Sequence, residues 1–505
     1  MIRADMKKQI WELALAFGVL ALGACGGGSS SSDTNLVQIP TLSPTPIPTP
    51  SPAATPFVAL KFAYEAHRLS NRDVVPEYTY AGVVYSGGLA AIFAGGSISV
   101  DFQRDGYPEV VVPLNKAYGT PAYAAMPYVL LSNTNGRLMY DPAHNAAMPS
   151  VFGARRAAVL SVGGKSAAFF VAHNVSGVYG DPKGLGSAIL LGQRAGAVTT
   201  LLDALPRITT KQDLPDNATD AHSMATGDIN GDGLDDILIG NWNPWGGFPP
   251  TILLQTPSGQ FAASSSNFPA SLLSVPLTNP NSEGNENNNL LLDLHFVDVN
   301  GDKYADLIAG FGHGSTPSFL FINRNGQFSF EDRIALPPSI YGINTSLHME
   351  TKNTDIDNDG DQDLVILYSR YVPYYGGNYI QILRNDSGKF TDTTETALPQ
   401  DQSYIMGKRL EWSSDVFIRD LDKDGLVDIL HGLNDGRLMV YFNKGAGQFT
   451  RLTTTLRNNT VGRLVAVDDF NADGKQELSY FEYTGGSSTE NTFALTVYEL
   501  DFQKP

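Results

Sequence analysis

The chain has 505 residues, of which 42% are apolar, enough for a large folded core. Its charge is one-sided, because 52 acidic residues against 34 basic ones give a net charge of -18. Such a chain has no surplus of cations to neutralise phosphates, so its composition argues against nucleic-acid binding. The single cysteine excludes a disulfide within the chain, so packing or bound metal must stabilise the fold.

The first 25 residues have the pattern of an export signal. Three basic residues lie among the first eight, and an apolar stretch over 11–24 follows. It ends in Leu22-Gly23-Ala24-Cys25, which resembles the bacterial lipobox. The resemblance implies that Cys25 carries a lipid anchor. With Gly26 after it, it also implies the outer membrane or cell surface of a Gram-negative bacterium. An ordinary signal peptide before an incidental cysteine is the alternative.

Residues 26–56 read as a linker. Glycine and serine come first, and a tract with seven prolines between positions 40 and 56 follows. Such a tract favours an extended polyproline chain of about 3.1 Å per residue and buries no core. We therefore expect the folded domain to cover residues 57–505.

Five segments of this domain follow one nine-residue pattern, here called an acid loop. Oxygen-bearing side chains stand at positions 1, 3, 5 and 9, and glycine stands at position 6 in four of the five. Calcium takes six to eight oxygens at about 2.3–2.6 Å. The pattern therefore predicts calcium cages, with a backbone carbonyl at position 7 and a bidentate acid at position 9. The predicted ligands are Asp228, Asn230, Asp232, Leu234 and Asp236; Asp298, Asn300, Asp302, Tyr304 and Asp306; Asp355, Asp357, Asp359, Asp361 and Asp363; Asp420, Asp422, Asp424, Leu426 and Asp428; and Asp469, Asn471, Asp473, Lys475 and Glu477.

Two weaker copies lie upstream. The segment 101–109 keeps oxygens at the four positions, and we treat it as a weaker, sixth calcium site. Its ligands would be Asp101, Gln103, Asp105 and Glu109. The segment 161–169 has lost its acids, so no metal is expected there. Lys165 stands at its position 5, where an ammonium would take the place of the ion.

The loops mark repeats of one size. They begin at residues 101, 161, 228, 298, 355, 420 and 469, which are 49–70 residues apart. An apolar run follows each loop, and in the first six units a glycine turn comes later. Each unit thus predicts a four-stranded antiparallel sheet with the acid loop between its first and second strands. Radial packing of such sheets gives an all-β fold, a seven-bladed β-propeller. The last unit lacks a fourth strand, which we expect the segment from Phe57 to about Tyr85 to supply, closing the ring.

The repeats resemble the FG-GAP and VCBS repeats of integrin α-chain propellers and of bacterial surface proteins. The resemblance covers about residues 57–505 and implies a propeller with structural calcium ions. Three features depart from the pattern: Lys303 replaces the glycine, Glu477 replaces the last aspartate, and the second unit lacks its acids.

The loops between second and third strands suggest a ligand face, because they are rich in aromatic residues suited to a sugar or a protein partner. The candidates are Trp242, Trp245, His313, Tyr371, Tyr374 and Tyr375. Packing of these rings within their own loops is the alternative.

We expect a cell-surface binding or adhesion module for polysaccharide or protein. The alternatives are a secreted polysaccharide lyase or hydrolase and a non-catalytic scaffold of a surface complex. Catalysis would need an acid, a base and a cation brought together. The candidates for these roles on or before the first strands are His222, His348, Glu350, Glu411 and Arg463. Since the chain contains no established catalytic motif, we favour binding over an enzyme.

Overall fold

The computed structural model describes most of residues 57–503. Its longest gaps are 116–127, 146–155, 172–187, 208–218, 242–249 and 265–289, and residues 1–56 lie outside it. The predicted signal, the linker and Cys25 are therefore not described. No helix in the described part is both long and apolar enough to cross a membrane.

Each repeat predicted from the sequence forms one antiparallel set of strands, which is called a sheet here and numbered by repeat. One bridge, Gly312 to Leu347, joins the sets of repeats 4 and 5 into a single eight-stranded sheet. Sheet 1 contains β4 (Phe93–Ala94) and β5 (Ile98–Val100), both paired with β6 (Glu109–Asn115), then β7 (Tyr128–Thr134) and β8 (Arg137–Tyr140). Sheet 2 contains β9 (Arg156–Val162), β10 (Lys165–Val171), β11 (Ala188–Gly192) and β12 (Val198–Thr200). Sheet 3 contains β13 (Ala221–Gly227), β14 (Asp236–Asn241), β15 (Thr251–Gln255) and β16 (Phe261–Ser264). Sheet 4 contains β17 (Leu290–Val297), β18 (Asp306–Gly312), β19 (Phe319–Asn323) and β20 (Phe328–Ala335).

The last three sheets follow the same plan. Sheet 5 contains β21 (Ser346–Thr354), β22 (Asp363–Arg370), β23 (Gly376–Asp386) and β24 (Lys389–Asp392). Sheet 6 contains β25 (Phe417–Arg419), β26 (Asp428–Gly432), β27 (Arg437–Asn443) and β28 (Phe449–Thr455). Sheet 7 contains β29 (Gly462–Asp468), β30 (Glu477–Gly486), β31 (Asn491–Gln503) and β1 (Phe57–Ser70). Outside this plan lie the hairpin of β2 (Tyr78–Tyr80) and β3 (Val83–Tyr85), the short helix α4 (Thr394–Ala397) and the 3-10 turn η7 (Ile343–Thr345).

Burial explains why the second strands are continuous apolar runs. Every residue of β18 is buried, as is every residue of β22 except Arg370, because both faces of a second strand are covered by neighbouring sheets. The outer strand β20 is exposed or half-buried at every position but Phe328. The molecule is therefore all-β, with its most apolar strands inside and its polar strands at the rim.

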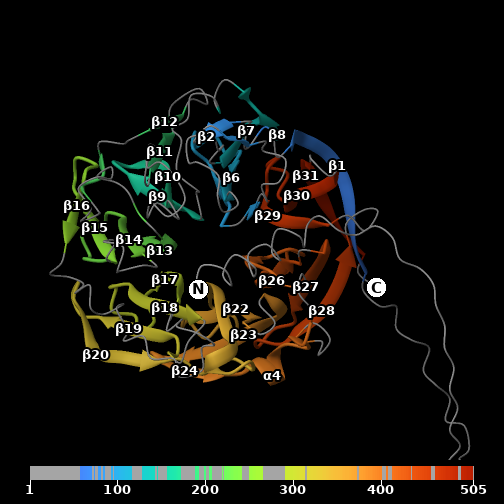
Figure 1. Cartoon of the computed structure of the whole chain (residues 1–505). Coiled ribbons are helices and arrows are strands. Elements are labelled where there is room, and N and C mark those ends of the chain that lie inside the picture. The colour runs from blue at the N-terminus through green and yellow to red at the C-terminus, as the bar shows by residue number, and fades with distance from the viewer. Residues whose placement is uncertain are drawn as a thin grey trace, which may run out of the picture.

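Each pair of neighbouring sheets shares a layer of core. Ile252 of sheet 3, for example, packs with Leu307 and Phe321 of sheet 4. Similar clusters join sheets 2 to 3, 4 to 5, 5 to 6 and 6 to 7. Val110 of sheet 1 packs with Val465 of sheet 7, so the first and last sheets of the chain also share a layer of core. Figure 1 shows the sheets standing around a common centre.

The N-terminal strand completes the last sheet, as the sequence predicted. β1 pairs antiparallel with β31 from Phe57 opposite Gln503 to Ser70 opposite Thr492, with two register shifts. In Figure 1 the blue β1 lies along the outer side of the red β31. Only β1 takes this part, because β2 and β3, which belong to the same predicted segment, pair with each other. The two ends of the domain thus share one sheet.

Sheet 2 lacks a loop at the place where the other sheets have one. β9 and β10 are joined by Gly163 and Gly164 alone, both with positive φ, and Lys165 is paired with Val162. A two-residue turn of this kind suits the twist of a hairpin. The prediction that this unit keeps its turn and its second strand is confirmed. The expectation that the Lys165 ammonium replaces an ion was wrong, since Lys165 is exposed at the start of a strand and no cage surrounds it.

Candidate metal centres

The acid loops join the first and second strands of their sheets, as predicted. Loop 228–236 runs from β13 to β14, for example, and loop 355–363 runs from β21 to β22. Position 9 is already the first residue of the second strand. The second residue of each loop is apolar and buried: Phe102, Ile229, Val299, Ile356, Leu421 and Phe470 are at most 5% exposed. This side chain anchors each loop in the core.

The first carboxylate of each loop shapes the turn by accepting backbone hydrogen bonds. Asp355 accepts from the N–H groups of Asp359 (3.1 Å) and Gly360 (3.0 Å), which are positions 5 and 6. The first aspartate makes the same pair of bonds in loops 101–109, 228–236, 298–306, 420–428 and 469–477. The carboxylate at position 5 in turn accepts from the N–H of position 7, at 2.8–3.0 Å. The carboxylates of positions 1 and 5 are thereby held within one turn.

Position 6 has the positive φ that its glycine predicts. Gly360 has φ +99° and Gly425 has φ +85°. Lys303 takes the same conformation in loop 298–306, with φ +75°, where a side chain is strained. The loop tolerates this departure, because the N–H of Lys303 still donates to Asp298 at 2.8 Å.

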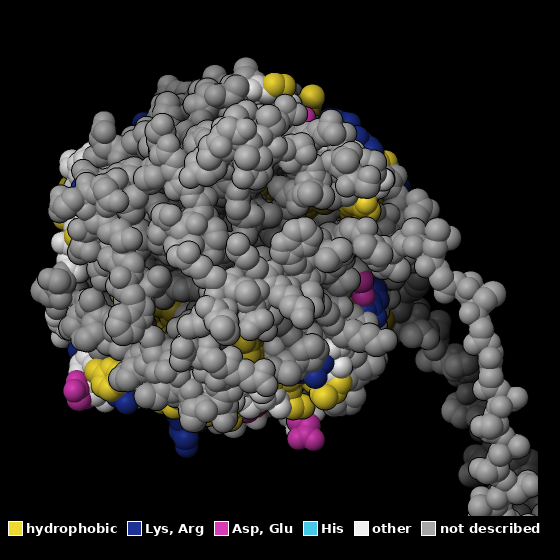
Figure 2. Space-filling view, in the orientation of Figure 1, with side chains coloured by type: hydrophobic (Ala, Val, Ile, Leu, Met, Phe, Trp, Pro, Cys, Tyr) yellow, Lys and Arg dark blue, Asp and Glu magenta, His cyan; other side chains and the backbone are white. Residues whose placement is uncertain are grey.

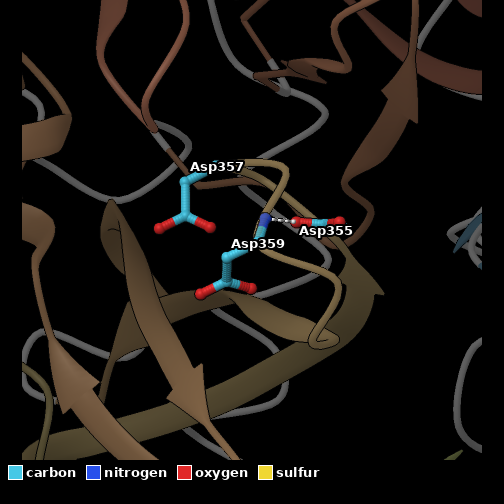
Figure 3. Close-up of side chains that lie close together, drawn as sticks. All are labelled: Asp355, Asp357 and Asp359. Atoms are coloured by element: carbon cyan, nitrogen blue, oxygen red, sulfur yellow. Dashed lines mark hydrogen bonds between the residues drawn. The ribbon is translucent and has the colours of Figure 1, made fainter.

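The side chains of loop 355–363 converge as a cation site requires. Ligand atoms of Asp355, Asp357 and Asp359 all lie within 4.8 Å of one another, and Figure 3 shows the three carboxylates around the loop. The Oδ1 atom of Asp357 is buried and accepts no hydrogen bond from any described residue. Burial, and next to it the Asp359 charge, raises the pKa of Asp357. An acceptor of this kind fits a bound cation.

Two further loops gather three acids within the same 4.8 Å limit. One set is Asp420, Asp422 and Asp428, and the other is Asp469, Asp473 and Glu477. Loops 228–236 and 298–306, which like loop 469–477 carry asparagine at position 3, bring no three acids of the described residues together within this limit. Several acid clusters could therefore hold a metal ion, and hard oxygen donors of this kind suit calcium.

The acid at position 9 is committed to the backbone on both of its oxygens. In Asp363, Oδ2 accepts from Ile356 N (2.8 Å), and Oδ1 accepts from Asn385 N at the end of the third strand (2.8 Å). Asp236, Asp306 and Asp428 make the same two bonds. This bonding disfavours the bidentate role predicted from the sequence, because each oxygen has at most one lone pair left. An ion would meet this carboxylate through one oxygen.

Burial also changes the acidity of position 9. It raises the pKa of Asp236, Asp306 and Asp363 to about 6, and that of Asp428 and Glu477 to about 7. Two backbone N–H donors oppose the shift in each aspartate but do not cancel it. Ionising these acids near neutral pH is therefore costly unless a cation lies beside them.

The weaker loop 101–109 has the same turn but a different third position. Asp101 binds the N–H groups of positions 5 and 6, and Glu109 binds that of Phe102 at 2.9 Å. The amide of Gln103, however, donates to Glu109 at 2.7 Å. Burial raises the pKa of Glu109 to about 7. Its three carboxylates equal the number at the ligand positions of loop 469–477, where Asn471 makes the same contact to Glu477 at 3.2 Å, so this loop keeps the geometry of a candidate site.

Sequence reasoning missed a set of amide residues at the ends of third strands. The Nδ2 group of Asn385 donates to the carbonyl of Val299, in the acid loop of the preceding sheet (2.8 Å). Asn133, Asn323 and Asn443 make the same contact to the loop of the sheet before, and Gln255 makes it to the hairpin of sheet 2. Their sequence signal was an amide just before each glycine turn, three residues ahead of Gly136, Gly326 and Gly388.

The candidate ligand face is only partly described. Trp242, Trp245, His313 and Tyr374 lie outside the described residues. Tyr371 and Tyr375 are half-buried against the core between sheets 5 and 6, and Tyr375 lies 4.5 Å from Trp412 between ring centroids. Figure 2 shows hydrophobic, acidic and basic side chains of the described residues interspersed along the rim. The two described tyrosines thus pack against the core, and the rest of the face stays a prediction.

The first strands hold a buried charged network near the centre of the ring. Arg156 of β9 donates to the carbonyl of Met349 (2.5 Å) and lies 3.5 Å from Asp293 of β17. His348 is fully buried between Ser318 (2.8 Å) and Thr351 (2.7 Å), and burial lowers its pKa to about 4. These residues tie sheets 2, 4 and 5 together.

The residues considered for catalysis are not assembled into an open site. Glu350 is buried and binds the N–H of Val416 at 2.6 Å, and Arg463 stacks over Trp412 at 4.8 Å. His222 is on sheet 3 and Arg463 on sheet 7, while Glu411 lies outside the described residues. The described members of this set are engaged in contacts within the fold, as when Glu350 also pairs with Lys352 at 2.9 Å.

Comparisons with known proteins agree on the repeats. An FG-GAP-like repeat family model matches residues 355–431 and 420–479, and an FG-GAP repeat model matches 221–241. The chain therefore contains FG-GAP repeats, which indicate a β-propeller-like module. The search of curated proteins found no match.

Two solved structures similar to this chain are rhamnogalacturonan lyases. One is the exotype enzyme YesX, with 12% identity over 86% of this chain and 75% of its own, and a TM-score of 0.38. The other is from Bacillus licheniformis, with 11% identity over 82% and 73%, and a TM-score of 0.39. Similarity at this level says nothing about the activity of this chain.

Proposed function

We propose that this chain is a seven-bladed β-propeller that binds calcium in five acid loops, with loop 101–109 as a weaker sixth site. The observation that carries the proposal is the repeated loop geometry. In each loop a first carboxylate folds the turn, and in three of the five loops ligand atoms of three acids lie within 4.8 Å of one another. In loop 355–363 one of these oxygens, Oδ1 of Asp357, is buried without a hydrogen-bond donor among the described residues.

Calcium would serve the fold, because each of the five loops crowds three to five acids at the junction of two strands. Without a cation these carboxylates repel one another, and the acid at position 9 is also desolvated. An ion would neutralise these carboxylates. Because it binds the folded state and not the unfolded state, a calcium concentration [L] raises the free energy of unfolding by RT ln(1 + [L]/Kd). In a chain with one cysteine, these ions would take the part that disulfides have in other exported proteins.

Calorimetric titration of residues 57–505 with calcium tests the metal sites. Asp359→Asn removes one charge from a loop while leaving an oxygen to accept the N–H of Asp361. We expect this variant to lose one tight site. The control Asp501→Asn changes an exposed acid on β31, outside every loop, and should leave the count unchanged. A wild-type chain that takes up no calcium would refute the proposal.

The function of the surface is proposed as binding or adhesion, with a polysaccharide or a protein as ligand. The export signal, the acidic composition and the aromatic loops between second and third strands support it. A glycan array with the calcium-loaded domain, a pulldown from a membrane fraction and a screen for cleavage of acidic polysaccharides test it together. Binding without turnover is the expected result. New reducing or unsaturated ends would replace this proposal with the lyase or hydrolase.

We also propose export and anchoring through a lipid on Cys25. The support is the Leu22-Gly23-Ala24-Cys25 sequence after a basic and then apolar start. The full chain should partition into the detergent phase of a bacterial membrane extract, and Cys25→Ser should move it to the aqueous phase. A Cys25→Ser chain that stays with detergent would contradict the anchor.

A further inference from the structure

We propose that the amide residues at the ends of the third strands are positioning residues for calcium, each holding the acid loop of the preceding sheet so that neighbouring sites are coupled. The inference rests on the calcium binding proposed above. It assigns a role to Asn323, Asn385 and Asn443, none of which is a predicted calcium ligand.

The contact falls on the residue between two ligand positions. In loop 298–306, Val299 is position 2, between the predicted ligands Asp298 and Asn300. Its N–H donates to Asp306 of the same loop (3.1 Å), and its carbonyl accepts from Asn385 of the next sheet (2.8 Å). Val299 is therefore held through both of the peptide groups that flank it, the first by its own loop and the second by the neighbouring sheet. Such fixing sets positions 1 and 3 before an ion arrives, which favours binding.

The same amide residue also contacts the loop of its own sheet. The backbone N–H of Asn385 donates to Oδ1 of Asp363 at 2.8 Å. The Oδ1 atom of Asn385 accepts from Gly388 N, which fixes the side chain in its own turn (2.8 Å). Asn385 is fully buried, so none of these bonds is exchanged with solvent. One residue thus touches two proposed metal sites.

The same contact recurs between successive sheets, so that it connects one acid loop to the next. Asn443 of sheet 6 donates to Ile356 in the loop of sheet 5 (3.0 Å), and Asn385 of sheet 5 donates to Val299 in that of sheet 4. Asn323 of sheet 4 donates to Ile229 in that of sheet 3 (2.8 Å). Gln255 ends the series on Ser161, in the sheet without an acid loop (2.9 Å). Four acid loops, those of sheets 3 to 6, are linked in this way.

The linkage predicts that calcium binding in one loop favours calcium binding in the neighbouring loop. The hydrogen bonds run from one sheet to the loop of the preceding sheet, but the coupling free energy is the same in both senses. An ion in loop 355–363 orders Asp363, and through it Asn385, which then holds the neighbouring loop 298–306. By linkage, an ion in loop 298–306 must favour binding in loop 355–363 by the same factor. Removing the amide leaves a buried carbonyl without its donor, and we expect about a tenfold loss of affinity in the loop that it holds.

Tyr304 provides a reporter of that loop and of the neighbouring loop 228–236. It stands at position 7 of loop 298–306, and its ring lies against Gly231 of loop 228–236, where an added Cβ would come within 2.8 Å of it. Terbium, a hard trivalent cation that takes oxygen-rich calcium sites, luminesces when a nearby tyrosine is excited. The part of the signal lost in Tyr304→Phe therefore reports the loops around this ring.

The test is a terbium titration of residues 57–505, followed through the Tyr304-dependent signal. Asn385→Leu should weaken binding about tenfold, although every predicted ligand is unchanged. Asn385→Ser is the second variant, since its hydroxyl can still accept within the turn but is too short to reach Val299, and it should give the same loss. Asn145→Leu is the control, because that amide binds the backbone of Leu130 and Asp141 and touches no acid loop.

The outcomes separate the two proposals. Weakening in both Asn385 variants but not in Asn145→Leu supports the positioning role. Equal affinities in wild type and in folded Asn385 variants would overturn it while leaving calcium binding intact. A wild-type chain that binds neither terbium nor calcium would instead overturn the proposed function. Circular dichroism before each titration establishes that the variants are folded.

Discussion

Removal of calcium should lower the melting temperature of this domain by many degrees. One site filled at a hundred times its Kd stabilises the folded state by about 2.7 kcal/mol, so five sites contribute roughly 13 kcal/mol. A domain of about 450 residues unfolds with an entropy of roughly 0.9 kcal/mol/K, at about 2.1 cal/mol/K per residue. The ratio is a shift of about 14 °C, if the ring unfolds as one unit.

Scanning calorimetry of residues 57–505 in calcium and in a calcium chelator measures this shift. Excess magnesium in the chelated sample controls for ionic strength, because magnesium fits such flexible oxygen cages poorly. Asp359→Asn should show a smaller shift than wild type, by about the share of one site. Transitions within 1–2 °C of each other in the two wild-type samples would refute the reasoning.

Three further predictions concern pH, a strained turn and ring closure. Burial raises the folded-state pKa of Asp363 to about 6 and of Asp428 to about 7. In the metal-stripped domain the stabilisation from these two acids is therefore complete below their unfolded-state pKa and is lost as the pH rises through their folded-state pKa. The metal-stripped domain should therefore melt lower at pH 8 than at pH 5, and a higher melting point at pH 8 would contradict the burial argument. Lys303→Gly should stabilise the calcium-loaded domain by about 0.5–1 kcal/mol in urea unfolding, since it removes a side chain from a residue at φ +75°. A chain that begins at residue 71 lacks β1 and leaves β31 as an open edge, so size-exclusion chromatography should show aggregates or dimers, whereas a monomer with unchanged melting would argue against closure by β1.

The sequence was informative wherever the signal was local. Nine-residue acid loops and later glycine turns located the first-to-second and third-to-fourth connections of most sheets, because both depend on backbone conformations that only a few residue types favour. The missing strand of the last unit predicted that β1 would close the ring. The repeat itself carried this information, since a sheet of three strands leaves an edge that the N-terminal segment can cover.

Contacts between distant residues were not predictable in the same way. Asn385 and Val299 are 86 positions apart, and Arg156 and Met349 are 193 apart. An asparagine before a glycine reads as a turn former, which Asn385 also is, so its second role was hidden. The acid at position 9 was interpreted as a bidentate ligand because the sequence shows a carboxylate but not the two backbone N–H groups that face it. Lys165 was predicted to lie at position 5 of an acid loop, but a two-residue turn joins β9 and β10 and makes Lys165 the first residue of a strand.

A map of the calcium-loaded domain tests the central claim most directly. In a crystal grown with ample calcium, anomalous density should appear inside loop 355–363, at about 2.3–2.6 Å from carboxylate oxygens of Asp355, Asp357 and Asp359. Equivalent density should appear in the loops that begin at residues 228, 298, 420 and 469. Ordered loops with no ion in any of them under these conditions would contradict the account.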